Sequence, residues 1–132
     1  MKNFEELDVF QRAVELTTLV YGATRSFPVD ERFGLTSQIR RAAVSVVSDI
    51  AEGQGRLTRG EWRQFLSQAR GSLFEVQAQA IIAEKLGFLD EPMYRKLRSA
   101  VKRVAMPLAG LIAYVRSRER PTTDHRQPTT LR

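Results

Sequence analysis

Two acidic side chains in residues 38–56, QIRRAAVSVVSDIAEGQGR, have a spacing that could support chemistry. Asp49 and Glu52 are three residues apart, so they share one face of a helix, where two carboxylates can bind a metal ion or transfer a proton. Helical di-metal sites also need Glu-x-x-His pairs, and the one histidine, His125, lies in the polar stretch TTDHRQPTT outside every predicted helix. We therefore expect a charged network of Arg41, Asp49 and Glu52 at the rim of a packed surface.

The rest of the sequence offers no catalytic constellation. It contains no cysteine, which excludes disulfides, thiolate nucleophiles and cysteine metal sites. It has no Ser-His-Asp arrangement and no glycine-rich phosphate loop, because Gly-Gln-Gly at 53–55 is better interpreted as a helix stop. The sequence thus predicts a non-enzymatic protein without a cofactor.

Four helices are predicted to position these residues, because apolar side chains recur every three or four positions and no stretch alternates with the period of a strand. The first is expected over about residues 8–26. The second is expected over about residues 35–52, with Gly53 and Gly55 as left-handed terminators. A capping box from Thr58 to Glu61 begins the third helix, Gly87 ends it, and Asp90 opens the fourth. The fold class is all-α.

The length of 132 residues fits a single domain. We expect this domain over residues 1–120 and a flexible polar tail over residues 121–132, which are rich in threonine, proline and charge. The N-terminal residues fit neither a signal peptide nor a transit peptide, and no apolar run approaches the length of a membrane span. The expected location is the cytoplasm.

The net charge of +6 lies entirely in the second half of the chain. Residues 1–66 carry nine basic and nine acidic side chains, whereas residues 67–132 carry twelve and six. Five cations of the fourth helix fall within an arc of roughly 160° opposite its apolar seam: Arg95, Lys96, Arg98, Lys102 and Arg103. They indicate an anionic partner, RNA or DNA first, bound through its backbone. A solvated helix back that serves only solubility is the alternative.

Surplus apolar surface predicts self-association. Phe74, Ala78 and Ile81 form a second stripe on the third helix, turned roughly 135° from its main seam, and such surface on a small domain marks a protein interface. The alternative is that these residues cover the edge of the core.

The second helix has an apolar arc of roughly 200° and is expected to be buried on more than one side. Arg40 points into this arc and is expected to need a carboxylate partner.

Three segments of the chain match the pattern of a known family: LDVFQRAVELTTLVYGAT, FPVDERFGLTSQIRRAAVSVVSDIAEGQGR and FLSQARGSLFEVQAQ. In this order they resemble the four-helix-bundle proteins of the 23S rRNA intervening-sequence family. The sequence departs from many members at Val47 and Asp49, where they have proline and asparagine. The central motif includes Gln38, Arg40, Arg41, Ser45, Asp49, Glu52, Gly53 and Arg56.

The resemblance implies an antiparallel up-down bundle that assembles into a ring-like homopentamer. The accessory proteins of diversity-generating retroelements, a related branch, bind nucleic acid and a reverse transcriptase through basic surface. We therefore hypothesise a homo-oligomer that binds nucleic acid or a ribonucleoprotein. An oligomeric protein-protein scaffold with no nucleic-acid role is the second hypothesis.

Overall fold

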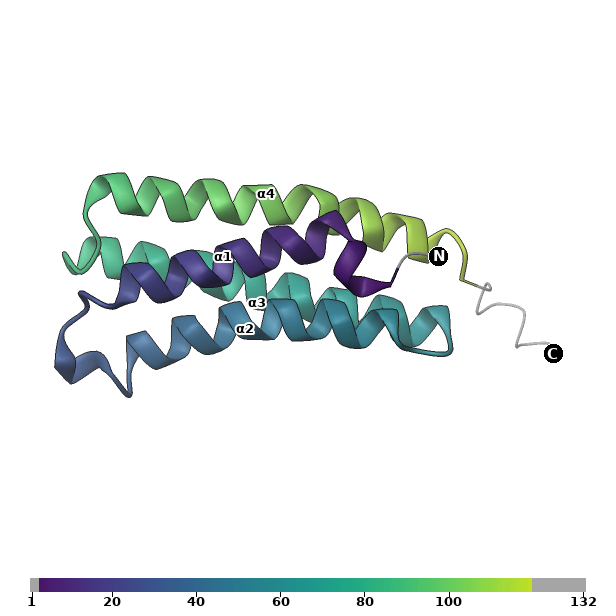
Figure 1. The fold of residues 1–132 in the computed structure, drawn as a ribbon, viewed down its shortest axis with the longest axis horizontal. Helices are drawn as coiled ribbons and strands as arrows, with labels where there is room; N and C mark the ends of the chain where they lie inside the picture. The colour runs from purple at the N-terminus through teal and green to yellow at the C-terminus, as the bar shows by residue number, and fades with distance from the viewer. Residues whose placement is uncertain (1–2, 120–132) are drawn as a thin grey trace, which may run out of the picture.

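The computed structural model describes residues 3–119, and the predicted tail lies outside the described residues. Four helices dominate this part of the chain: α1 (Asp8–Thr24), α2 (Leu35–Gln54), α3 (Arg59–Lys85) and α4 (Glu91–Arg116). Two 3-10 turns, η1 (Phe4–Glu6) and η2 (Val29–Glu31), precede α1 and α2. Because residues 3–119 contain no strand, the predicted all-α four-helix fold is confirmed (Figure 1).

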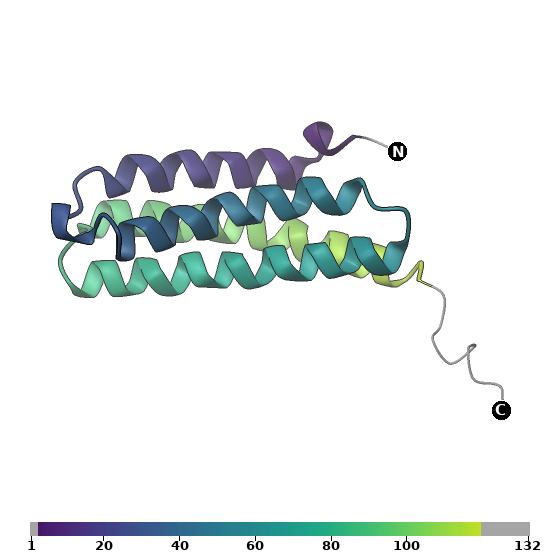
Figure 2. The same ribbon diagram turned by 90° about the horizontal axis from the view of Figure 1, so that it is seen from below.

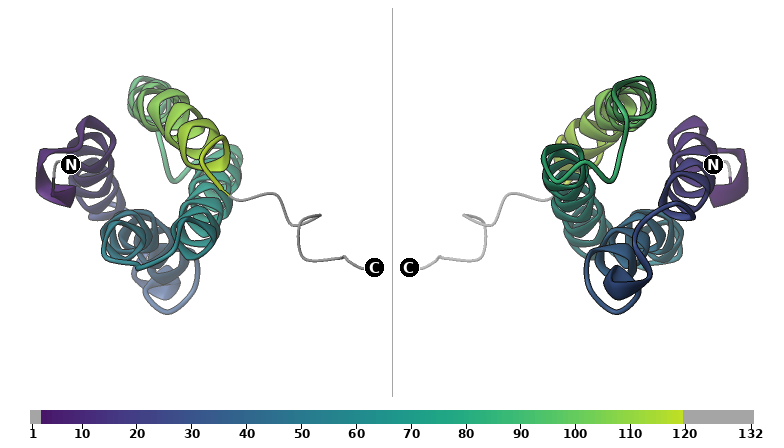
Figure 3. Two further views of the ribbon diagram at one scale, coloured as in Figure 1. Left: turned by 90° about the vertical axis from the view of Figure 1, so that its right-hand side faces the viewer. Right: turned by 90° about the vertical axis from the view of Figure 1, so that its left-hand side faces the viewer.

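The chain reverses its direction at each connection between helices, so successive helices lie side by side (Figures 1 and 2). Viewed along their axes, the helices follow one another around a central core (Figure 3). α1 and α3 each contact both α2 and α4, whereas α2 and α4 lie diagonally across the bundle without contacting each other. A residue on the outer side of α4 therefore faces away from α2.

The core is filled by aliphatic side chains at the three-four spacing that the sequence predicts. Leu16, Val46, Leu73 and Val104, one from each helix, are completely buried. Burying such a side chain contributes about 1.5–3 kcal/mol to folding. This shared core fixes which face of each helix remains available to partners.

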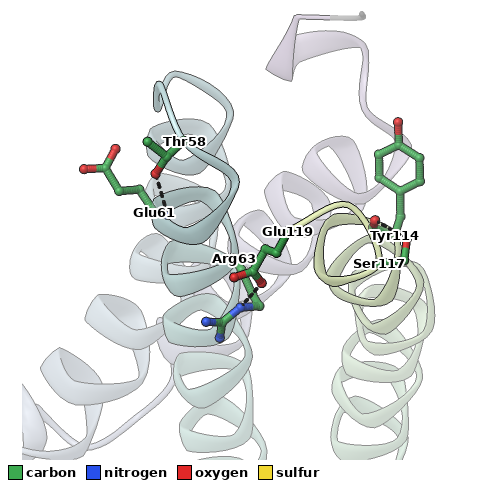
Figure 4. A network of polar contacts seen from close by, with 6 residues as sticks. All are labelled: Thr58, Glu61, Arg63, Tyr114, Ser117 and Glu119. Carbon is green, nitrogen blue, oxygen red and sulfur yellow. Dashed lines mark hydrogen bonds and ion pairs between the residues drawn. The ribbon is translucent and has the colours of Figure 1, made fainter. Parts of the chain in front are cut away.

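Two of the predicted helix boundaries are set by side-chain hydrogen bonds, and a third is set by the backbone conformation of a glycine. The Thr58 hydroxyl accepts a hydrogen bond from the Glu61 amide at 3.1 Å, but the Glu61 carboxylate points away, so only half of the predicted capping box forms (Figure 4). Asp90 accepts from the Met93 amide at 2.9 Å at the start of α4. Gly87 ends α3 with a φ of 80°, a conformation that glycine adopts without steric cost.

Gly55 ends α2, as predicted, but Gly53 does not, and neither glycine has the predicted left-handed conformation. α2 continues through Gly53 to Gln54, and Gly55 has a φ of −86°, which is not left-handed. Gly53 is buried, and a Cβ atom there would lie 2.9 Å from Trp62 Cδ1 and 3.1 Å from Phe65 Cβ. Glycine at position 53 therefore allows α3 to approach α2 closely.

α4 passes through Pro107 without interruption. Proline has no amide hydrogen, so it cannot donate to the carbonyl four residues earlier, which belongs to Arg103. The Arg12 guanidinium of α1 donates to that carbonyl at 3.0 Å instead. A side chain from the neighbouring helix thus replaces the missing backbone donor.

Candidate nucleic-acid interface and subunit surface

The two carboxylates of α2 have different partners, and the predicted network with Arg41 does not form. Asp49 accepts a hydrogen bond from the Ser45 hydroxyl at 3.3 Å, whereas Glu52 pairs with Arg56. Arg41 is exposed on the helix. Arg41 lies eight residues before Asp49, about 12 Å along a helix. Each carboxylate therefore contacts a residue one turn away instead of Arg41.

A chain of hydroxyl groups connects Asp49 to α3. The Ser72 hydroxyl donates to Ser45 at 3.1 Å, and Ser45 donates in turn to Asp49. Partial burial raises the pKa of Asp49 above its ordinary value of 3.8, the hydrogen bond from Ser45 lowers it, and the negative charge of Glu52 raises it further. Within residues 3–119 no three acidic, histidine or cysteine side chains gather as metal ligands. These groups connect α2 to α3.

Arg40 has no carboxylate partner within residues 3–119, which corrects the sequence prediction. Its Nε donates to the Thr24 hydroxyl at 2.8 Å, and its terminal nitrogen donates to the Tyr21 carbonyl at 3.4 Å. The guanidinium also lies 4.6 Å from the centre of the Tyr21 ring. Neutral acceptors and an aromatic face are sufficient here because the side chain is only half-buried.

All five predicted cations of α4 are exposed, but two have acidic partners. Arg95 pairs with Glu91 at 2.8 Å on the same helix, and Arg103 lies 3.6 Å from Glu15 of α1. The other three form no ion pair with any residue in the described part of the chain: Lys96, Arg98 and Lys102. Among the five predicted cations, the uncompensated positive charge therefore lies on the N-terminal half of α4.

The second apolar stripe lies outside the core of the bundle. Phe74 is 49% exposed and Ile81 is 39% exposed, and Ala78 between them is exposed as well. Ile82 and Leu86 extend the same apolar surface towards the end of α3. The stripe remains the predicted subunit surface.

The outer side of α2 is more open than its apolar arc predicts. Val44 is 41% exposed, so this edge of the helix is not covered within one chain. Val14 and Val44 face an apolar groove of about 150 Å³ between α1 and α2, which Thr17, Thr18 and Val47 also line.

On the other side of α2, a polar groove of about 690 Å³ extends from Phe33 along Arg41 and Ser45 to α3.

An exposed aromatic residue on α4, Tyr114, is not among the site residues that the sequence predicts. Tyr114 is 40% exposed, and the Arg118 guanidinium lies 4.0 Å from the centre of its ring. The spacing of four residues was the available signal, since it places the two side chains on one face of a helix. Nearby, Arg63 of α3 forms an ion pair with Glu119 (Figure 4).

One comparison with known proteins gives a match that covers most of the described chain. In residues 3–119, none of the helices combines the length and hydropathy needed to cross a bilayer. No curated protein matches the chain. Residues 5–110, most of the helical region, match the family described as 23S rRNA-intervening sequence protein. The chain therefore belongs to the 23S rRNA-intervening sequence protein family.

Proposed function

We propose that this protein is a non-enzymatic, cytoplasmic homo-oligomer that binds the backbone of nucleic acid through the basic surface of α4. The observation that carries the proposal is the uncompensated charge of Lys96, Arg98 and Lys102. Exposed cations of this kind attract phosphate and release its condensed counterions on binding.

The chemistry of this surface favours phosphate contacts over base contacts. Lysine and arginine side chains on the outside of a helix bundle can reach phosphates without entering a groove, and such contacts carry no sequence information. RNA and DNA of unrelated sequence are therefore expected to compete about equally.

Self-association would multiply the effect of this small charged surface. Membership of the family favours five subunits, and the exposed stripe of Phe74, Ala78 and Ile81 supplies apolar surface for their contacts. Several copies of the basic surface on one particle bind a long polyanion with high avidity. In this proposal the partner is an extended nucleic acid, free or in a ribonucleoprotein.

The test reverses three charges and keeps the core. Lys96, Arg98 and Lys102 are changed together to glutamate, which leaves the buried seam residues Leu97 and Val101 in place. Binding of a labelled oligonucleotide at low salt is expected to be lost, and binding by the parent protein is expected to weaken steeply as salt rises.

A matched control separates local charge from net charge. Arg25, Arg32 and Arg41 are exposed and lie on or next to α1 and α2, and their change to glutamate alters the net charge by the same amount. This control is expected to retain binding. If both triple variants bind as well as the parent, or if the parent does not bind, the proposal is wrong, and the protein-protein scaffold becomes the better explanation.

A further inference from the structure

An aromatic platform lies on the helix that carries the basic surface. Tyr114 projects outward from α4, whereas the Arg63–Glu119 pair lies between α4 and α3 (Figure 4). The guanidinium of Arg118 covers the Tyr114 ring at 4.0 Å. Aromatic rings and guanidinium planes are both surfaces on which nucleic-acid bases stack.

The register of α4 aligns this platform with two of its cations. Lys96 and Tyr114 are separated by 18 residues, which is about five turns at 3.6 residues per turn, so they lie on the same side of the helix. Arg103 is within roughly 20° of the same line. The three side chains define an edge of α4 about 27 Å long, with cations followed by an aromatic ring.

The acidic groups beside this edge are already paired. Glu15 of α1 lies 3.6 Å from Arg103, and Asp8 lies 2.9 Å from Arg12. Lys96 has no acidic partner in residues 3–119. Within residues 3–119 the edge therefore carries unpaired positive charge at its two ends, Lys96 and Arg118, whereas the charge of Arg103 is compensated by Glu15.

From this arrangement we infer that the nucleic acid is bound as a single strand, with a base stacked on the Tyr114–Arg118 platform. The inference rests on the proposed function, because the cations of α4 must hold the phosphates. In a duplex the faces of the bases are occupied by neighbouring bases, so only a single strand can use an aromatic platform. The platform is tolerant of sequence because every base has a stacking face.

Three other exposed aromatic residues have an arginine over the ring and are less suited to this role. Tyr21 of α1 lies beside Arg40 of α2, whose guanidinium already donates to Thr24 and to the Tyr21 carbonyl. Phe33 with Arg32 precedes α2, which lies diagonally across the bundle from α4. Phe74 with Arg70 belongs to the predicted subunit surface of α3. Tyr114 lies on α4, the helix of the uncompensated cations, and Arg118 follows the end of this helix.

The experiment compares a labelled single strand with a duplex of the same length and mixed sequence, by fluorescence anisotropy at low salt. The parent is expected to prefer the single strand. Tyr114→Ala is expected to weaken single-strand binding roughly five-fold to a hundred-fold for each base stacked and to leave duplex binding unchanged. Tyr114→Phe keeps the ring and is expected to bind like the parent. Circular dichroism checks that each variant remains helical.

The outcomes separate this inference from the function on which it rests. If the parent binds neither probe, the proposed function is wrong and the inference falls with it. If the parent binds both probes and Tyr114→Ala leaves their affinity ratio unchanged, the platform is not used, although the basic surface is. Loss of binding to both probes by Tyr114→Ala, with helicity retained, also overturns the inference, because stacking cannot account for it.

Discussion

Arg12 shows how one side chain can stabilise a proline inside a helix. The Arg103 carbonyl, which Pro107 leaves without a backbone donor, accepts from Arg12 at 3.0 Å. The same guanidinium lies 2.9 Å from Asp8. The contact therefore connects α1 to α4 at the point where α4 lacks a hydrogen bond of its own.

This arrangement predicts a coupling between Arg12 and Pro107. Arg12→Ala is expected to lower the free energy of unfolding by about 1 kcal/mol, since it removes the donor from the Arg103 carbonyl. In a Pro107→Ala background the new amide can donate to that carbonyl, so the same change is expected to cost less. Urea denaturation of the two single variants and the double variant, at one protein concentration, measures the difference. Equal costs in the two backgrounds would contradict the explanation.

The sequence predicted the wrong roles for Arg40 and Gly53, because these roles depend on neighbours that are distant along the chain. Arg40 was expected to need a carboxylate, but Tyr21 and Thr24 supply its contacts. Gly53 was expected to end a helix, but its role is set by Trp62 and Phe65. Composition and spacing place these residues on the correct helix or boundary region, but they do not reveal what packs against them.

At the scale of the helices, periodicity and local capping were sufficient to predict most of the fold. α3 begins after Thr58 and α4 after Asp90, as predicted, because each of these side chains caps an amide three residues later. α1 ends at Thr24, two residues before its predicted end, since its last residues form a turn before Pro28. Local signals fix where helices begin more sharply than where they end.

The contact between α2 and α3 has a polar part that should respond to pH. Because partial burial raises the pKa of Asp49 in the folded state, the folded protein binds this proton more tightly than the unfolded chain does. Ionisation of Asp49 therefore lowers stability as pH rises above about 4. Asp49→Asn is expected to be more stable than the parent near pH 7 and about as stable near pH 3, below both pKa values.

Thermal or urea unfolding of both proteins across this pH range measures the difference. Glu91→Gln is the control, because it breaks the exposed ion pair with Arg95 on α4, a helix that does not contact α2, and is not expected to gain stability at neutral pH. A stability difference between Asp49→Asn and the parent that does not change with pH would contradict the pKa assignment.

At the scale of the whole molecule, the exposed stripe on α3 predicts an oligomer, and the family resemblance implies five subunits. Light scattering of the purified protein is expected to show this assembly at micromolar concentration. Phe74→Asp is expected to dissociate it without melting the helices, since the Phe74 side chain lies outside the core. Leu57→Asp is a matched control, because Leu57 is exposed in the loop between α2 and α3 and is expected to leave the assembly intact.

Two results would contradict this prediction. A monomeric parent would remove the argument for a subunit surface and for five subunits. Loss of helicity by Phe74→Asp would show that the residue supports the core. The sequence predicts that surplus apolar surface exists, but what covers this surface is decided by contacts between chains.

The diagonal placement of α2 and α4 makes separate evolution of their outer surfaces possible. The two helices do not contact each other, and effects of distant substitutions usually add independently. Substitutions at Lys96 or Tyr114 should therefore accumulate in a lineage without changing the grooves beside Val44 and Arg41. Members of the family that keep the same bundle are therefore free to change the outer surface of α4, while the opposite side of the molecule remains under its own selection.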